Sequence, residues 1–167
     1  MSSARPIDLY RQFIEGGSYD IHTASESTKR QLDKVFTPAE RDMHVYKGMV
    51  IYEDDANMSG MQHAIESYSS TSESRRTAVD YADRAFDLQD EWEMGHTGVI
   101  DKPVTPLIVN LTIKKGTPIA DARKLLGSGG MRQFEKEITV GRKVQYSYSN
   151  LRRVGDYWQV DAVVRRR

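Results

Sequence analysis

The sequence contains no cysteine, and this single absence excludes several kinds of chemistry. Disulfide bonds, thiolate zinc sites and cysteine nucleophiles all need a thiol, although the redox compartment of the protein stays open. The four histidines show no metal-ligand spacing, such as a pair at positions i and i+4 of a helix, and we treat them as structural or surface residues. The sequence therefore predicts no bound metal.

Long apolar runs and an excess of charge of one sign are also missing. No stretch approaches the length needed to span a membrane, and the start, Met-Ser-Ser-Ala-Arg-Pro, lacks the apolar segment of a signal peptide. Lysine and arginine together number 24, as do aspartate and glutamate, so net charge gives no argument for nucleic acid or an anionic membrane. We expect a cytoplasmic protein without membrane contact, with secretion that needs no cleaved signal as the alternative.

Basic residues gather only near the C-terminus, between Arg142 and Arg167. A solvated terminal strand explains this cluster most simply, because the charges can face water along one side of the strand. Contact with RNA or with an acidic protein is the alternative interpretation, and nucleic acid is not the partner we favour.

What is present indicates one globular α+β domain. A chain of 167 residues can bury a sizeable core, and neither an internal repeat nor a linker divides it. Helical patterns cluster at the start and β-type patterns follow, with one inserted helix, which is typical of the α+β class. We expect a single, monomeric domain over 1–167, with a helical lead-in at 1–42 and a sheet core at 43–164.

The individual elements are predicted from capping residues, periodicity and turns. Helices are expected at 6–15, at 23–36, from an N-cap at Thr37, at 78–86 and at 121–126. Strands are expected at 45–52, 63–68, 107–113, 134–140, 144–148 and 158–164, with a loop at 87–103 and a turn around Asn150. The early helices carry no evident chemistry.

The stretch 134–140 has the most specific pattern. It follows a glycine-rich loop, and alternation places Glu135, Glu137 and Thr139 on one face of a strand. Ile138, on the opposite face, favours the core, which directs the two carboxylates toward solvent or into a cleft. Taken alone, this is the pattern of an ordinary solvated strand face.

Two further stretches are hard to explain by structure alone. Lys47 interrupts an otherwise apolar strand and is followed by a glycine, which allows another group to approach the backbone. Four consecutive hydroxyl residues, at 69–72, end a predicted strand and precede a helix. Capping that helix needs one hydroxyl, so capping by Ser70 or Ser72 does not account for the run.

In this order, the three stretches resemble the mono-ADP-ribosyltransferases of the Arg–Ser–Glu class. The family pattern is an aromatic-Arg-Gly strand, a Ser-Thr-Ser strand end and a Glu-x-Glu strand behind a mobile loop. The matching residues are Tyr46-Lys47-Gly48, Ser70-Thr71-Ser72 and Glu135-Lys136-Glu137, and the resemblance covers roughly 45–146. It implies two packed, mainly antiparallel sheets that form an NAD cleft, with N-terminal helices. The absence of P-loop and dinucleotide-fold glycine motifs from the sequence fits such a cleft.

The resemblance also implies an activity and roles for particular residues. The family transfers ADP-ribose from NAD, as substrate, to a protein side chain and releases nicotinamide. Glu137 would stabilise the oxocarbenium-like transition state at the ribose, as carboxylates do in glycoside cleavage. Ser70 would hold Glu137 or the ribose in register. Tyr81 would face the nicotinamide ring, with core packing on the Ala78–Ala85 stripe as the alternative. The cofactor contacts implied by the resemblance are Lys47, Ser70, Thr71, Ser72, Tyr81 and Arg84.

Glu135 would face the acceptor. In this family a glutamate at this position accompanies arginine acceptors, because a guanidinium stays protonated and needs a carboxylate to make it nucleophilic. The resemblance therefore implies a target protein with an accessible arginine, contacted by Phe134, Glu135 and the loop at 126–133. By resemblance to the enzymes of T4-like phages, we expect a bacteriophage protein that modifies host proteins in the host cytoplasm. A bacterial toxin domain delivered by other machinery is the alternative.

One residue departs from the family pattern. The first motif of the family has arginine, whereas this chain has Lys47, a point charge without the bidentate fork of a guanidinium. Arg84, one turn beyond Tyr81, is a candidate to compensate at the NAD phosphates, and a surface helix charge is the plainer interpretation of it. Two other functions stay open: an NAD glycohydrolase, in which water replaces the acceptor, and a degenerate transferase fold kept to bind protein or RNA.

Overall fold

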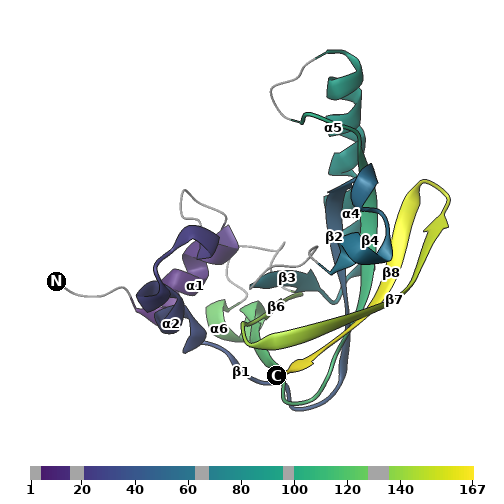
Figure 1. The fold of residues 1–167 in the computed structure, drawn as a ribbon. Coiled ribbons are helices and arrows are strands. Elements are labelled where there is room, and N and C mark those ends of the chain that lie inside the picture. Colours follow the sequence, from purple (N-terminus) through teal and green to yellow (C-terminus); the bar gives the residue numbers. More distant parts are fainter. Residues whose placement is uncertain (1–4, 16–20, 63–67, 96–99, 128–135) are drawn as a thin grey trace.

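The computed structural model describes residues 5–15, 21–62, 68–95, 100–127 and 136–167, in which helices pack around one mixed sheet (Figure 1). The helices are α1 (Pro6–Glu15), α2 (Glu26–Asp33), α3 (Met58–Met61), α4 (Arg75–Ala82), α5 (Arg84–Glu93) and α6 (Ala122–Leu126), with 3-10 turns at Ile21–Thr23 and Glu53–Asp55. The strands are β1 (Thr37–Pro38), β2 (Met43–Tyr52), β3 (Ser69–Ser72), β4 (Val104–Ile113), β5 (Pro118–Asp121), β6 (Glu137–Val140), β7 (Val144–Val154) and β8 (Tyr157–Arg166). The predicted α+β class is confirmed.

The described strands form a hydrogen-bonded sheet in the order β1-β5-β6-β3-β2-β4-β8-β7. In these residues every neighbouring pair is antiparallel except β4 with β8. The sheet is narrowest where β2 meets β3, because the register there joins Tyr46 to Ser72. This junction divides the sheet into two halves, β1-β5-β6-β3 and β2-β4-β8-β7. The two halves share one buried cluster, in which Ile138 of β6 packs with Leu107 of β4 and Val160 of β8. The expected pair of packed, mainly antiparallel sheets is thus present as two halves of one continuous sheet.

Helix α4 lies directly on β2 because residue 48 has no side chain. A Cβ built on Gly48 would lie 1.7 Å from the carbonyl oxygen of Ala78 and 3.0 Å from the amide nitrogen of Ala82. Such distances bring the backbone of the helix against the backbone of the strand. Ser74 caps the helix by accepting a hydrogen bond from the amide of Thr77 at 3.3 Å. The close approach expected at this glycine is made by α4.

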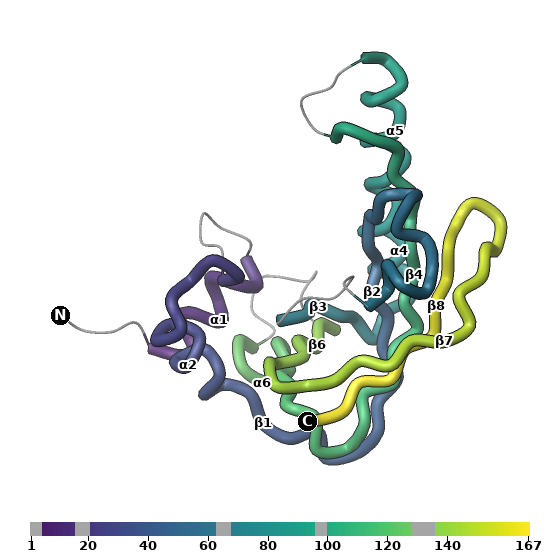
Figure 2. The backbone as a smooth tube through the Cα atoms, viewed as in Figure 1, coloured from purple at the N-terminus to yellow at the C-terminus, as the bar shows by residue number. Residues whose placement is uncertain are grey.

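The N-terminal helices cover the other half of the sheet. Helices α1, α2 and α6 gather beside β3 and β6, whereas α5 projects from the opposite end of the molecule (Figure 2). Tyr10 and Ile14 of α1 are buried in one cluster with Leu32 of α2 and Ala120 of β5. Helix α1 therefore packs against the half of the sheet that contains β3 (Ser69–Ser72), which we call the serine strand.

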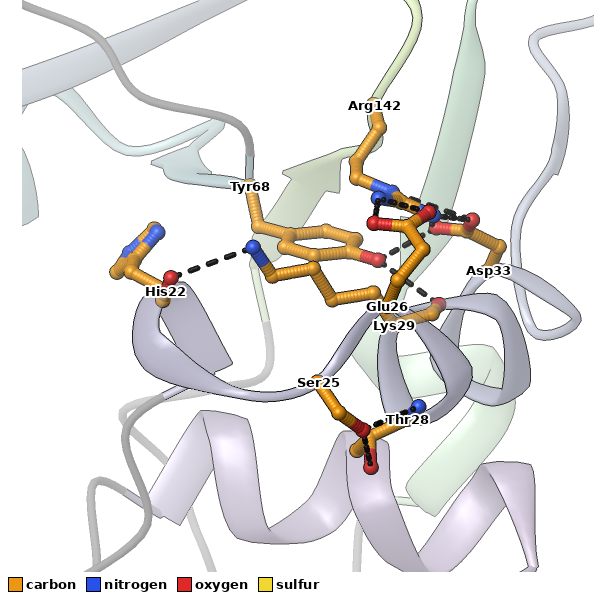
Figure 3. A network of polar contacts seen from close by, with 8 residues as sticks. All are labelled: His22, Ser25, Glu26, Thr28, Lys29, Asp33, Tyr68 and Arg142. Atoms are coloured by element: carbon orange, nitrogen blue, oxygen red, sulfur yellow. Dashed lines mark hydrogen bonds and ion pairs between the residues drawn. The ribbon is translucent and has the colours of Figure 1, made fainter.

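A network of polar contacts fastens α2 to this half of the sheet (Figure 3). Arg142, which follows β6, donates from Nη2 to Asp33 Oδ2 at 2.6 Å and forms an ion pair with Glu26 at 2.9 Å. The Tyr68 hydroxyl lies 2.5 Å from Asp33 Oδ1 and 3.0 Å from the carbonyl oxygen of Lys29. Since Tyr68 directly precedes β3, the network holds the helical lead-in and the serine strand together.

The prediction of a helix that begins at Thr37 is wrong. Thr37 and Pro38 form β1 and pair with β5, Thr37 opposite Ile119. Proline is tolerated in an edge strand because its missing N–H leaves no ladder bond broken on the solvent side. Pairing with a distant strand overrides the local capping signal here.

Among the other boundaries that differ from the prediction, two change the type of structure. The loop expected at 87–103 begins only after α5, whose Leu88 and Trp92 pack against a buried cluster while acidic residues face water. The turn expected around Asn150 is an irregularity inside β7, where Asn150 has a φ of 56° and the register with β8 shifts. Asparagine tolerates positive φ in a bulge as well as in a turn, so its signal was ambiguous. Most of the strand expected at 63–68 lies outside the described residues.

Candidate active site

A cavity of about 190 Å³ opens where the two halves of the sheet meet, between α4 and α1. Its walls come from five elements, α1, β2, β3, α4 and β6. The cavity brings together Lys47, Ser70, Ser72, Tyr81 and Glu137, which are far apart in the sequence. Three separate predicted stretches therefore converge on one place.

Glu137 supplies the acid of the cavity. It is the first residue of β6, pairs with Ser72 of β3 and is only 9% exposed. Burial raises the pKa of its carboxyl to about 7, and the nearby charge of Lys47 opposes that shift. Of the two surroundings predicted for this carboxylate, solvent or a cleft, Glu137 has the cleft.

Lys47 supplies the base. Its side chain is partly buried, and Nζ donates a hydrogen bond to the carbonyl oxygen of Ser70 at 3.0 Å. Burial lowers the pKa of this amine to about 8, while the negative charge of Glu137 acts in the opposite direction. A cation and an anion with pKa values shifted toward each other thus share one small cavity, an arrangement often found in functional sites.

The serine strand presents two hydroxyls to the same face as Glu137. Ser70 lies opposite Thr139 and Ser72 lies opposite Glu137, and residues that are directly opposite in a sheet share a face. The hydroxyl of Ser72 accepts a hydrogen bond from the amide of Ser74 at 3.0 Å. Because Ser74 caps α4, neither Ser70 nor Ser72 is used as the helix cap.

Thr71 borders the cavity, but its hydroxyl donates to the carbonyl oxygen of Ile138 at 2.6 Å and is thereby engaged within the sheet. Tyr81 lines the cavity from α4 and is 50% exposed, so it is not part of the packing stripe formed by Ala78 and Ala82. Arg84 is exposed on the first turn of α5 and is not among the described residues that line the cavity.

The residues predicted to face the acceptor lie mostly outside the described ranges. Phe134, Glu135 and most of the loop at 126–133 lie outside the described residues, and Lys136 is the first residue described after them. In the ranges that are described, no cluster of three or more His, Asp or Glu residues suited to a metal ion occurs. Nor does any helix in those ranges have the length and apolar character to cross a membrane.

Helix α1 contributes to this site, although no role in it was predicted for this helix from the sequence. Ile14 of α1 lines the cavity. The hydroxyl of Tyr10, one turn earlier, lies 3.0 Å from Thr139 Oγ1, and Thr139 Oγ1 donates to Glu137 Oε2 at 3.5 Å. The only signal in the sequence was Thr139 on the same strand face as Glu137, because the helical residues are more than a hundred positions away.

Neither a protein-family model nor a curated protein matches the sequence. The structure is nevertheless similar to solved structures of ADP-ribosyltransferases. Vis in complex with the M6 inhibitor, a protein from Vibrio splendidus, has a TM-score of 0.53 and 11% identity, covering 98% of this chain and 74% of that chain. Plx2a, a toxin from Paenibacillus larvae, has a TM-score of 0.51 and 16% identity, with 95% and 78% covered.

C3stau2 from S. aureus, whose structure was solved with NAD, has a TM-score of 0.51 and 15% identity, with 99% of this chain and 89% of that chain covered. At identities this low the likeness concerns the fold. The arrangement of helices and sheet in this chain is that of the ADP-ribosyltransferases.

Proposed function

We propose that this chain, which has the fold of the ADP-ribosyltransferases, transfers ADP-ribose from NAD to an arginine side chain of a target protein. The observation that carries the proposal is the convergence of Glu137, Lys47 and the serine strand on one cavity. The similar structure of C3stau2 was solved with NAD, which supports NAD as the substrate here. Plx2a is a toxin that shares the fold, which supports transfer of ADP-ribose.

The nicotinamide end of NAD suits the cavity best. At about 190 Å³ the cavity is smaller than the roughly 300–1,000 Å³ typical of complete small-molecule sites, so it takes one end of the dinucleotide. Tyr81, which is half exposed at the rim, offers an aromatic face to the nicotinamide ring. Lys47, a cation that lines the cavity, would contact the phosphates, and it replaces the family's arginine with a single point charge.

In the proposed reaction the bond between C1′ of the ribose and nicotinamide breaks, and its electron pair leaves with nicotinamide. Positive charge develops on the ribose, and the Glu137 carboxylate stabilises it from a fixed position. Partial burial strengthens this interaction because less water screens it. A nitrogen of the acceptor guanidinium then forms the new bond to C1′, and Glu135 takes the proton that this nitrogen loses.

The rate of NAD cleavage should depend on pH in the direction set by Glu137. Catalysis needs the carboxylate, and since burial raises the pKa of Glu137 to about 7, the active fraction falls below that value. We expect kcat/KM for NAD to drop about tenfold per pH unit on the acid side. Nicotinamide release measured from about pH 5 to about pH 9 tests this. A rate that stays level across the acid range contradicts the assignment.

Replacing Glu135 by glutamine should separate transfer from NAD cleavage. The variant is expected to lose transfer to arginine, because the guanidinium loses the carboxylate that orients it. It should retain hydrolysis of NAD, because Glu137 is unchanged. Labelled NAD with a protein lysate measures both outcomes in one reaction.

The matched control is Lys136→Gln, which removes a charge from the adjacent, exposed residue. It should keep both activities. If Glu135→Gln transfers ADP-ribose to arginine as fast as the parent, the acceptor-side assignment of Glu135 is wrong.

We further propose that the acceptor belongs to a host protein, as for the phage enzymes that the motifs resemble. Action inside the host cytoplasm follows from that setting. The toxin Plx2a, which shares the fold, supports the alternative of a delivered toxin domain. A target found in a bacterial lysate rather than a eukaryotic one distinguishes the two.

A further inference from the structure

Helix α1 places a hydroxyl behind the catalytic strand. Tyr10 is fully buried, and its hydroxyl lies 3.0 Å from Thr139 Oγ1, 129 positions later in the chain. The same hydroxyl also lies within hydrogen-bonding distance of the carbonyl oxygen of Ala120, at the longer distance of 3.4 Å. A buried hydroxyl costs free energy unless it is hydrogen-bonded, so these contacts explain how a tyrosine is accommodated at the centre of an apolar helix face.

Thr139 connects this hydroxyl to the proposed catalytic carboxylate. It lies two positions after Glu137 on β6, so both side chains are on one face of the strand. Thr139 is completely buried, and its Oγ1 donates to Glu137 Oε2 at 3.5 Å. Its cross-strand partner is Ser70, which lines the cavity. Tyr10, Thr139 and Glu137 therefore form a continuous line from α1 to the cavity.

The direction of the hydrogen bonds along this line depends on the hydroxyl protons, because each hydroxyl has only one proton to donate. When Tyr10 donates to Thr139 Oγ1, the proton of Thr139 is free to point at Glu137. When Tyr10 donates to Ala120 instead, its oxygen becomes a competing acceptor for the Thr139 proton. The shorter distance to Thr139 favours the first arrangement, in which both donors point toward the carboxylate.

Tyr10 always has a proton to donate. Burial raises the pKa of its phenol well above the usual range, so it keeps its proton wherever the enzyme works. The groups that face Glu137 from the surrounding elements are Lys47 of β2, Thr139 of β6, Tyr81 of α4 and Tyr10 of α1 through Thr139. Of these, Lys47 and Thr139 both favour the ionised carboxylate.

We propose that Tyr10 is a positioning residue, which acts through Thr139 to hold the Glu137 carboxylate in the orientation and ionisation state that NAD cleavage needs. The proposal rests on the proposed function of Glu137. Under this proposal α1 contributes a positioning residue to the active site, in addition to packing on the sheet. A purely structural role for Tyr10 would change stability and leave the titration of Glu137 where it is.

Tyr10→Phe tests the proposal because it removes one oxygen and keeps the ring that packs in the core. We expect kcat for nicotinamide release to fall about tenfold, the effect of weakening one hydrogen bond to a charged group, with KM for NAD nearly unchanged. We also expect the acid limb of the pH profile to move upward. Carbon-13 NMR of the Glu137 carboxyl, assigned by its loss in Glu137→Gln, measures the same shift without catalysis.

Three further variants test whether the effect of Tyr10→Phe passes through Thr139. Thr139→Val should reproduce the titration shift, and adding Tyr10→Phe to it should cause no further shift. Thr139→Ser keeps the hydroxyl and should restore the parental titration. Tyr148→Phe is the matched control, since it removes a buried hydroxyl that has no hydrogen-bond partner among the described residues. It should leave kcat and the titration unchanged.

The outcomes distinguish failure of the positioning role of Tyr10 from failure of the proposed function of Glu137. If Tyr10→Phe folds and has the parental kcat and the parental Glu137 titration, the positioning role is overturned. If Glu137→Gln remains active, the proposed function fails, while the NMR titration still decides whether Tyr10 controls the carboxylate. Should Tyr10→Phe not fold, the Thr139→Val and Thr139→Ser pair carries the test, and equal titrations in the two overturn the proposal.

Discussion

Replacing Glu137 by glutamine is expected to abolish both transfer of ADP-ribose and hydrolysis of NAD, with a loss of about a thousandfold or more in kcat. Glutamine keeps the size of the side chain and can still accept a hydrogen bond. It has no negative charge to stabilise the cation that develops on the ribose. Both reactions pass through this cation, so both should fail together.

The control for this result is Glu73→Gln, because Glu73 lies on the segment that follows β3 and is exposed. Glu73→Gln removes a negative charge near the cavity, and Glu73 is not among the described residues that line the cavity. NAD cleavage by Glu137→Gln at the parental rate would show that the catalytic assignment is wrong. Loss of transfer alone would instead place Glu137 on the acceptor side.

Gly48→Ala is expected to prevent the native packing of α4 on the sheet. The added Cβ would lie 1.7 Å from the Ala78 carbonyl oxygen and 2.7 Å from its carbonyl carbon, far inside van der Waals contact. Both are backbone atoms, so no rotation of a side chain can relieve the clash. Overpacking commonly costs about 1–3 kcal/mol, and here we expect more than about 4 kcal/mol because a whole helix must move.

Such a loss approaches the total stability of many domains, about 5–15 kcal/mol, so the variant should unfold at a much lower urea concentration or fail to fold. Helix α4 carries Tyr81, and the same displacement should weaken NAD binding in any folded fraction. Gly155→Ala is the control: apart from its chain neighbours, no atom of the described residues lies within 4 Å of the added Cβ, and the φ of +62° is what opposes the change. We expect that control to lose about 1 kcal/mol. A parental unfolding midpoint for Gly48→Ala would refute the close packing described for α4 and β2.

The convergence of the motifs could be predicted because each one has a local signature and because, in this order, they resemble those of a known family. A charge inside an apolar strand, a run of hydroxyls at a strand end and alternating glutamates are all visible in the sequence. The structure brings Lys47, Ser70 and Glu137 to one cavity, as their order along the chain suggested. The shifted pKa values of Lys47 and Glu137 depend on burial and on their mutual distance, so no local pattern could indicate them.

The part played by α1 could not be predicted. Tyr10 has the periodicity of a core residue, and a buried tyrosine is the usual interpretation of that pattern. Its contact with Thr139 spans 129 positions and depends on how the helix packs on the sheet. The same kind of long-range pairing made Thr37 a strand residue against its local capping signal. In both places tertiary contacts overrode local signals.

The most direct test of the proposed activity is incubation of the parent protein and of Glu137→Gln with NAD labelled in its ADP-ribose part, in a host-type lysate. The account predicts nicotinamide release and label on an arginine of a lysate protein with the parent, and neither with the variant. Free ADP-ribose without labelled protein would indicate a glycohydrolase, and label on RNA would show that the acceptor is not arginine. Nicotinamide release no greater with the parent than with the variant, and no labelled product, would contradict the account and leave a fold that only binds.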